Sequence, residues 1–120
     1  MKGDTMSTAG VIIYRINQDG SLDGRWTHPE LKGLTGTERA TGGTPGKWEG
    51  VYDAEIYVGG QEAIFRGSLE IRPMGAAYTL NWVGTQIPPS GNSSIYTGIG
   101  LVEADNVLVA AFQESAPPSG

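Results

Sequence analysis

The chain has 120 residues, with 13 acidic and 8 basic side chains and a net charge of -5. Its length suits one domain, and the scattered basic residues exclude the basic face that nucleic-acid binding requires. The absence of cysteine excludes disulfides and thiolate chemistry, and no apolar run approaches the roughly 18 residues of a membrane helix.

The first ten residues, MKGDTMSTAG, carry one lysine and no apolar stretch behind it. They do not predict a signal peptide, so we expect a soluble, cytoplasmic protein. Small and polar residues at both ends predict a flexible lead-in over 1–9 and a disordered tail over 115–120. The span 10–114 is expected to form a single domain.

Eight runs of strand-forming residues follow one another, each bounded by turn residues. Asp19-Gly20 and Gly59-Gly60 favour tight hairpin turns, and Pro29-Glu30 can start a short helical turn before the third run. The runs are 10–17, 21–28, 33–41, 47–58, 62–72, 77–84, 94–102 and 107–113.

No window of the sequence carries a helical period of apolar residues. Short strands joined by tight turns, without crossover helices, predict an antiparallel up-and-down meander. Eight such strands can close into a barrel whose interior is filled by side chains or holds one small ligand. The expected fold class is therefore all-β, with a meander closed into a barrel of about eight strands.

Glycine accounts for 19 residues and recurs in one pattern, with a large residue two positions away on each side. Residues two apart share one face of a strand, so each such glycine leaves a gap between large side chains. The gap can admit a bend or another side chain, as small closed barrels require. The pattern occurs in Leu22–Trp26, Trp48–Tyr52 and Phe65–Leu69, and nearly repeats in Tyr96–Gly100.

The segment Asp19-Gly-Ser-Leu-Asp-Gly24-Arg-Trp26 resembles the second strand of avidin-type barrels, and the meander as a whole resembles small calycin and avidin-like barrels. The resemblance implies a small up-and-down barrel. It assigns no ligand-contact residue by position.

A second resemblance is to an uncharacterised group of bacterial barrel domains. The segments that show this resemblance are Tyr14–Trp26, Gly36–Glu38, Tyr96–Leu101 and Val107–Phe112. In those domains a segment like 48–112 precedes one like 10–41, so the order here looks circularly permuted. Such an order implies that strand 10–17 pairs with strand 107–113; the resemblance implies no activity.

Aromatic residues supply the candidate ligand contacts. Strand alternation directs several of them inward, and Tyr and Trp combine apolar bodies with polar tips that can orient a small ligand. The alternative is an ordinary packed core. The candidate ligand-binding residues are Tyr14, Trp26, Tyr78, Trp82 and Tyr96.

Glu38 is the candidate catalytic residue, because its predicted strand is short and flanked by glycine, which favours an inward carboxyl. In an apolar lumen its pKa would rise, and it could act as general acid or base. The alternative is a hydrogen bond that pins a barrel end, with Arg25 or Arg39 as partner. His28, the sole histidine, is expected to be an exposed residue at the rim.

No metal site and no cofactor are predicted. A zinc site needs three or four clustered ligands, and no phosphate loop or dinucleotide fingerprint occurs. The carboxylates of the fourth run are expected on the outer face, where Asp53 or Glu55 can pair with Arg66 across neighbouring strands.

Three functions fit these observations. The first is binding of a small apolar or aromatic ligand in the lumen, with one mouth gated by loops 85–93 and 42–47. The second is a cofactor-free cyclase or isomerase acting on a flexible substrate in the same lumen. The third is a structural or interaction module with a filled core. Neither nucleic acid nor a membrane is an expected partner, and self-association stays open.

Overall fold

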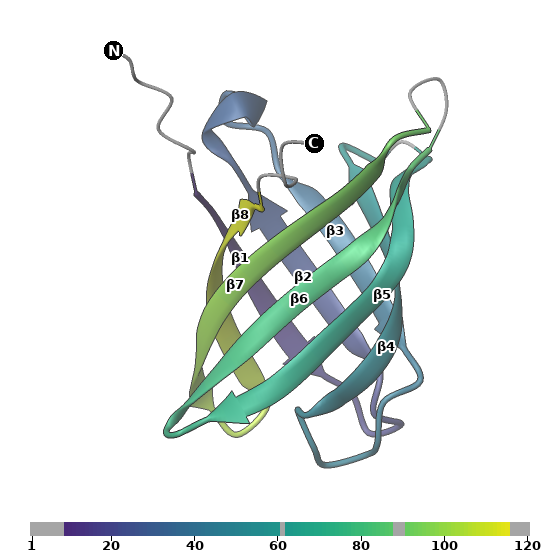
Figure 1. The fold of residues 1–120 in the computed structure, drawn as a ribbon. Coiled ribbons are helices and arrows are strands. Elements are labelled where there is room, and N and C mark those ends of the chain that lie inside the picture. The colour runs from purple at the N-terminus through teal and green to yellow at the C-terminus, as the bar shows by residue number, and fades with distance from the viewer. Residues whose placement is uncertain (1–8, 61, 88–90, 116–120) are drawn as a thin grey trace.

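A computed structural model describes residues 9–60, 62–87 and 91–115. Eight antiparallel strands form a closed barrel in which each strand pairs with its neighbours in sequence and the last pairs with the first (Figure 1). No helix in this described part is long and apolar enough to cross a membrane. The strands are β1 (Gly10–Ile16), β2 (Leu22–Thr27), β3 (Gly36–Thr41), β4 (Gly50–Val58), β5 (Ala63–Met74), β6 (Ala77–Gln86), β7 (Ser93–Ala104) and β8 (Val107–Glu114).

The predicted all-β closed meander is confirmed, and most strand bounds lie within a few residues of those expected. β3 begins later than predicted because the 3₁₀ helix η1 (Pro29–Leu31) is followed by a turn in which Lys32 and Gly33 have positive φ. Proline suits the first turn of a helix, and Nδ1 of His28 accepts a hydrogen bond from the Glu30 amide at 3.1 Å. Most of the predicted flexible lead-in and tail lies outside the described residues.

Closure of the barrel depends on β1 and β8. Their register sets Gly10 opposite Phe112, Ile12 opposite Ala110 and Tyr14 opposite Leu108, which confirms the predicted pairing of 10–17 with 107–113. A closed sheet leaves no unpaired strand edge among the eight strands.

Alternate residues of each strand face the interior, as the period of two requires. In β4, Tyr52 and Ala54 are buried, whereas Val51 is 60% exposed. The outer face carries the charged residues, and Nε of Arg66 lies 2.8 Å from Oε2 of Glu55. This contact confirms the predicted cross-strand ion pair on the outside of β4 and β5.

The interior aromatic rings lie over glycines of neighbouring strands. A methyl group at Gly24 would lie 2.9 Å from the Tyr14 ring, and one at Gly36 would lie 2.5 Å from the Trp26 ring. Any larger residue at these glycines would therefore displace a ring. The pairs are Tyr14 with Gly24, Trp26 with Gly36, Trp82 with Gly98, Phe112 with Gly10, and Phe65 with Gly84.

One end of the barrel is filled. Trp48 precedes β4 instead of belonging to it, and it is 6% exposed. The hydroxyl of Tyr52 donates to the Trp48 carbonyl at 2.8 Å, and the loop residue Gly43 packs against the Tyr52 ring. The loop 42–47 thus closes the end of the barrel at which β3 ends and β4 begins.

Replacing Gly67 with alanine should destabilise the barrel. Gly67 lies opposite Gly84, and an added methyl group would meet the Val83 carbonyl and the Gly84 backbone, which cannot move without disturbing the sheet. Overpacking of this kind costs about 1–3 kcal/mol. Urea unfolding of Gly67→Ala should show a loss of that size.

The matched control is Gly75→Asn. Gly75 has a φ of +60° and open space around its Cα, and asparagine tolerates that conformation. It should unfold close to the parent midpoint. An unchanged midpoint for Gly67→Ala would contradict the close packing of β5 and β6.

Candidate ligand-binding cavity

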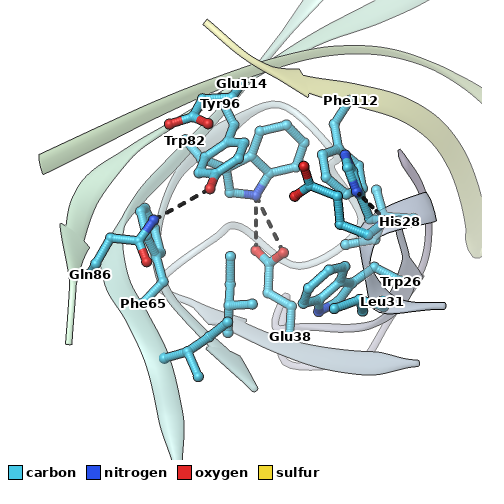
Figure 2. Close-up of a pocket in the computed structure, with 14 residues that line it drawn as sticks. Trp26, His28, Leu31, Glu38, Phe65, Trp82, Gln86, Tyr96, Phe112 and Glu114 are labelled. Atoms are coloured by element: carbon cyan, nitrogen blue, oxygen red, sulfur yellow. Dashed lines mark hydrogen bonds between the residues drawn. The ribbon is translucent and has the colours of Figure 1, made fainter. Parts of the chain in front are cut away.

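A cavity of about 360 Å³ occupies the barrel interior at the end opposite Trp48 and Tyr52. Its mouth is formed by η1 and by the strand ends that point the same way, namely the ends of β6 and β8 and the starts of β5 and β7. Figure 2 shows aromatic side chains from five strands converging on it. These aromatic residues are Trp26, Phe65, Trp82, Tyr96 and Phe112.

Phe112 lies at the centre of the aromatic wall. Its ring centroid is 6.1 Å from that of Trp26, 5.9 Å from that of Trp82 and 6.4 Å from that of Tyr96, each in an edge-to-face arrangement. Such pairs are favourable beyond the area they bury. The wall is therefore held in place by its own contacts as well as by the sheet.

Glu38 lies at the inner end of this cavity. It is 3% exposed, and its carboxyl faces the indole of Trp82 across the lumen (Figure 2). Oε1 accepts a hydrogen bond from the Tyr14 hydroxyl at 2.8 Å. Nε1 of Trp82 is 3.2 Å from Oε2, 3.3 Å from Oε1 and 3.2 Å from the Tyr14 oxygen. Strands β1, β3 and β6 thus contribute one residue each to a buried polar cluster.

The cluster depends on Gly24. In the sheet, Gly24 of β2 lies between Tyr14 of β1 and Glu38 of β3. Because Gly24 has no side chain, the Tyr14 ring can cross β2 and reach the carboxyl. A side chain at this position would separate the two partners.

Burial controls the protonation of this cluster. Loss of water raises the pKa of Glu38 from its ordinary 4.5 to about 7, and the hydrogen bonds from Tyr14 and Trp82 oppose part of that rise. Burial also raises the pKa of Tyr14, and the neighbouring carboxyl raises it further. Glu38 therefore exchanges its proton near neutral pH while Tyr14 remains a donor.

The mouth carries polar groups of mainly acidic character. Glu30 comes from η1, and Glu114 ends β8. Burial raises the pKa of the Tyr96 hydroxyl, and the charges of Glu114 and Glu30 raise it further. Gln86 lies beside Tyr96, with its Nε2 3.5 Å from the hydroxyl oxygen. No lysine or arginine is among the described residues that line the cavity, so none of them balances these two carboxylates.

The predicted site residues divide into two groups. Trp26, Trp82 and Tyr96 line the cavity, and Glu38 faces it. Tyr14 does not line it; it lies behind the carboxyl of Glu38 and is fully buried. Tyr78 begins β6 near the filled end and packs against the core away from the cavity.

Two expectations about partners and loops are wrong. Glu38 contacts neither Arg25 nor Arg39, because both arginines lie on the outer face; Arg39 pairs there with Asp23 at 2.7 Å. Loop 42–47 closes the filled end and does not gate the mouth. Loop 85–93 follows β6 at the mouth end, although residues 88–90 lie outside the described residues.

His28 lies at the rim and is partly buried, whereas an exposed position was expected. Its ring centroid is 6.2 Å from that of Phe112. Within the described parts of the chain, no three metal-ligating side chains come together.

Several cavity residues were not proposed as ligand contacts from the sequence. Strand alternation places Phe65 and Phe112 inside, so their position could have been inferred. Nothing in the local sequence indicates that Glu30 and Glu114, 84 residues apart, share one mouth.

Comparisons with protein-family models, with curated proteins and with solved structures find no match. The fold and the cavity therefore rest on the geometry of this chain. The likeness to calycin and avidin-like barrels, and the circularly permuted order, stay predictions.

Stability should depend on pH through Glu38. Folding raises its pKa, so between about pH 4.5 and 7 the folded protein binds more protons than the unfolded chain. The free energy of unfolding should therefore fall as pH rises through this window, by about 3 kcal/mol, and remain lower above it. Urea unfolding from pH 4.5 to 8 measures the loss.

Glu38→Gln is the control for this pH dependence, because its amide oxygen can still accept from Tyr14 and Trp82. The variant should lose the component of the pH slope that belongs to Glu38. A slope equal to that of the parent protein would contradict the assignment.

Proposed function

We propose that the barrel binds a small, largely apolar ligand in this cavity. The observation that carries the proposal is a cavity of about 360 Å³ in which one buried carboxyl, Glu38, faces aromatic walls. Ligand sites in proteins have volumes of roughly 300–1,000 Å³, mostly apolar walls and a few convergent polar groups. The cavity fits that description.

A core built only for stability would not contain this arrangement. Protein interiors are close-packed, and burying a carboxyl costs free energy unless its partners offset the loss of water. The barrel end near Trp48 and Tyr52 follows this rule, since large side chains fill it. At the other end the interior is not close-packed, and the buried Glu38 lies beside the empty space. This coincidence favours a role in binding.

The aromatic wall is suited to holding a ligand. The rings around Phe112 are fixed by edge-to-face contacts and by the glycines beneath them. Rigid rings lose little conformational entropy when a ligand arrives, so more of the contact energy appears as affinity.

Filling the cavity should abolish binding of a neutral apolar probe. Ile56 lines the cavity, and Ile56→Trp places an indole in that space. N-phenyl-1-naphthylamine, whose fluorescence rises in apolar surroundings, is the probe. We expect its affinity to fall at least about tenfold, because its rings and the new indole would compete for one volume.

The control is Val51→Trp, on the outer face of the same strand. This variant adds the same side chain without entering the cavity, so probe binding should be unchanged. Equal affinities of the two variants would place the probe outside the lumen and contradict the proposal.

A second candidate is general acid–base catalysis in the same cavity, as in a cofactor-free isomerase or cyclase. The observation that favours it is Glu38, which burial brings to a pKa of about 7 at the inner end of a cavity with aromatic walls. General acids and bases work best when their pKa lies near the working pH. Exclusion of water strengthens the interaction of such a group with a bound substrate.

The ring opening of 5-nitrobenzisoxazole tests this candidate. Ionised Glu38 would accept the carbon-bound proton while the N–O bond breaks, giving a cyanophenolate that is measured by its absorbance. The rate should rise with pH through about 7, following the pKa of Glu38, and Glu38→Gln should remove the acceleration.

Tyr14→Phe gives a second readout of the same step. It removes a hydrogen bond that lowers the pKa of Glu38, so the midpoint of the pH profile should move upward. A rate that survives in Glu38→Gln would overturn the role of Glu38 as base.

The third function, an interaction module with a filled core, has less support. Its premise is a packed interior, and packing is complete only at the Trp48 end.

A further inference from the structure

Apart from His28, the acidic and basic side chains that line the cavity are all acidic. They are Glu38 at the inner end and Glu30 and Glu114 at the mouth, and no lysine or arginine is among the lining residues. Arg25 and Arg39, which flank Glu38 in sequence or in the sheet, lie on the outer face. The negative charge of the carboxylates that line the cavity is therefore not balanced by a lysine or arginine beside them.

The Tyr96 hydroxyl is affected by this charge distribution. The carboxylates of Glu114 and Glu30 stabilise its protonated form from two sides of the mouth. The same potential attracts a positively charged ligand and repels an anion. A cation entering the barrel passes these two groups before it reaches Glu38.

Aromatic rings border the path from the mouth to Glu38. The faces of Trp and other aromatic rings attract cations within about 6 Å of the ring centroid, and the attraction grows where water is excluded. Trp26, Trp82 and Phe112 surround the inner cavity (Figure 2). These walls suit an apolar body and also tolerate a cationic group beside it.

Glu38 retains capacity to accept further hydrogen bonds. Oε1 accepts from Tyr14, and the Trp82 N–H is shared among Oε1, Oε2 and the Tyr14 oxygen. An ionised carboxylate offers about four acceptor positions. Oε2 receives only the shared Trp82 bond, so an ammonium group can bond to it from the lumen.

From these observations we propose that the cavity selects an organic monocation, an apolar or aromatic body bearing a protonated amine that pairs with Glu38. The inference rests on the proposed binding function and names the ligand class of that same site.

Proton exchange at Glu38 makes this selection measurable. A cation bound beside the carboxyl favours its ionised form, so binding releases a proton when Glu38 is protonated beforehand. With a pKa of about 7 in the empty site, the affinity for a cation should rise roughly tenfold from pH 6 to pH 8. A neutral ligand should bind without that dependence.

Few other titratable groups face Glu38 or the entering ligand. Tyr14 of β1 contacts the carboxyl directly, and Tyr52 of β4 lies behind Tyr14; both remain protonated in this range. Glu30 and Glu114 act at the mouth. Histidine is a residue type that changes charge near neutral pH, so His28 needs its own control.

The test compares three ligands with one naphthalene body: 1-naphthylethylamine, 1-naphthaleneethanol and 1-naphthaleneacetate. Isothermal titration calorimetry at pH 6 and pH 8, in buffers of different ionisation enthalpy, gives affinity and proton release together. At pH 8 we expect the amine to bind at least about tenfold more tightly than the alcohol, and the acetate more weakly than either. Only the amine should release protons.

Variants assign the effect to a residue. Glu38→Gln should remove the advantage of the amine and its proton release, while the alcohol still binds. His28→Asn keeps an acceptor for the Glu30 amide and should keep the pH response. Joint replacement of Glu30 and Glu114 by glutamine should weaken amine binding most at low salt, and leave the pH response in place.

The outcomes separate the two proposals. Alcohol binding equal to or tighter than amine binding at pH 8 would overturn the inference about charge and leave ligand binding in the lumen intact. A pH response that persists in Glu38→Gln would overturn the role of Glu38. Failure of all three ligands to bind would overturn the lumen as a site for such ligands, and the inference with it.

Discussion

Large aromatic rings lie over glycines of neighbouring strands throughout this barrel, and the rest of the interior follows from that arrangement. A barrel of eight strands encloses little more space than its side chains need. Several of these rings lie across a neighbouring strand at a position that has no Cβ, as for Tyr14 over Gly24 and Trp26 over Gly36. For these rings, the glycines thus leave the space that each ring occupies.

Packing along the barrel axis is uneven, and Glu38 lies where the filled part of the interior meets the cavity. On the Trp48 side of Glu38, Leu22, Leu80 and Leu108 are fully buried in the interior. Between Glu38 and the mouth, the aromatic residues lie against the barrel wall and leave the lumen open. Glu38 is therefore removed from bulk water by the strands around it while still facing a cavity. That position raises its pKa and, under the proposed function, is where a ligand would meet the carboxyl.

The buried cluster connects the stability of the barrel with its proposed function. Burial of Glu38 costs stability above neutral pH, and Tyr14 and Trp82 recover only part of that cost. A ligand that supplies positive charge or a hydrogen bond would recover more. Binding groups that destabilise the empty protein are common at functional sites, because the interaction they lack is the one the ligand provides. The same reasoning applies to binding and to acid–base catalysis.

Local sequence was sufficient for the strands, because alternation and turn residues are local properties. It indicated the closed meander, the inward aromatic residues and the inward Glu38. The strand order also indicates where the loops lie. Loop 42–47 follows the third strand and loop 85–93 follows the sixth, and in a meander the loops after odd-numbered and even-numbered strands lie at opposite ends of the barrel. The local sequence did not identify the hydrogen-bond partners of Glu38, since Tyr14 and Trp82 are 24 and 44 residues away from it along the chain. Register across several strands decides which of the inward residues meet, and the volume left between them exists only after the barrel has closed. For these physical reasons the fold could be read from the sequence, whereas the cavity, its acidic mouth and the protonation of Glu38 were decided by the tertiary structure.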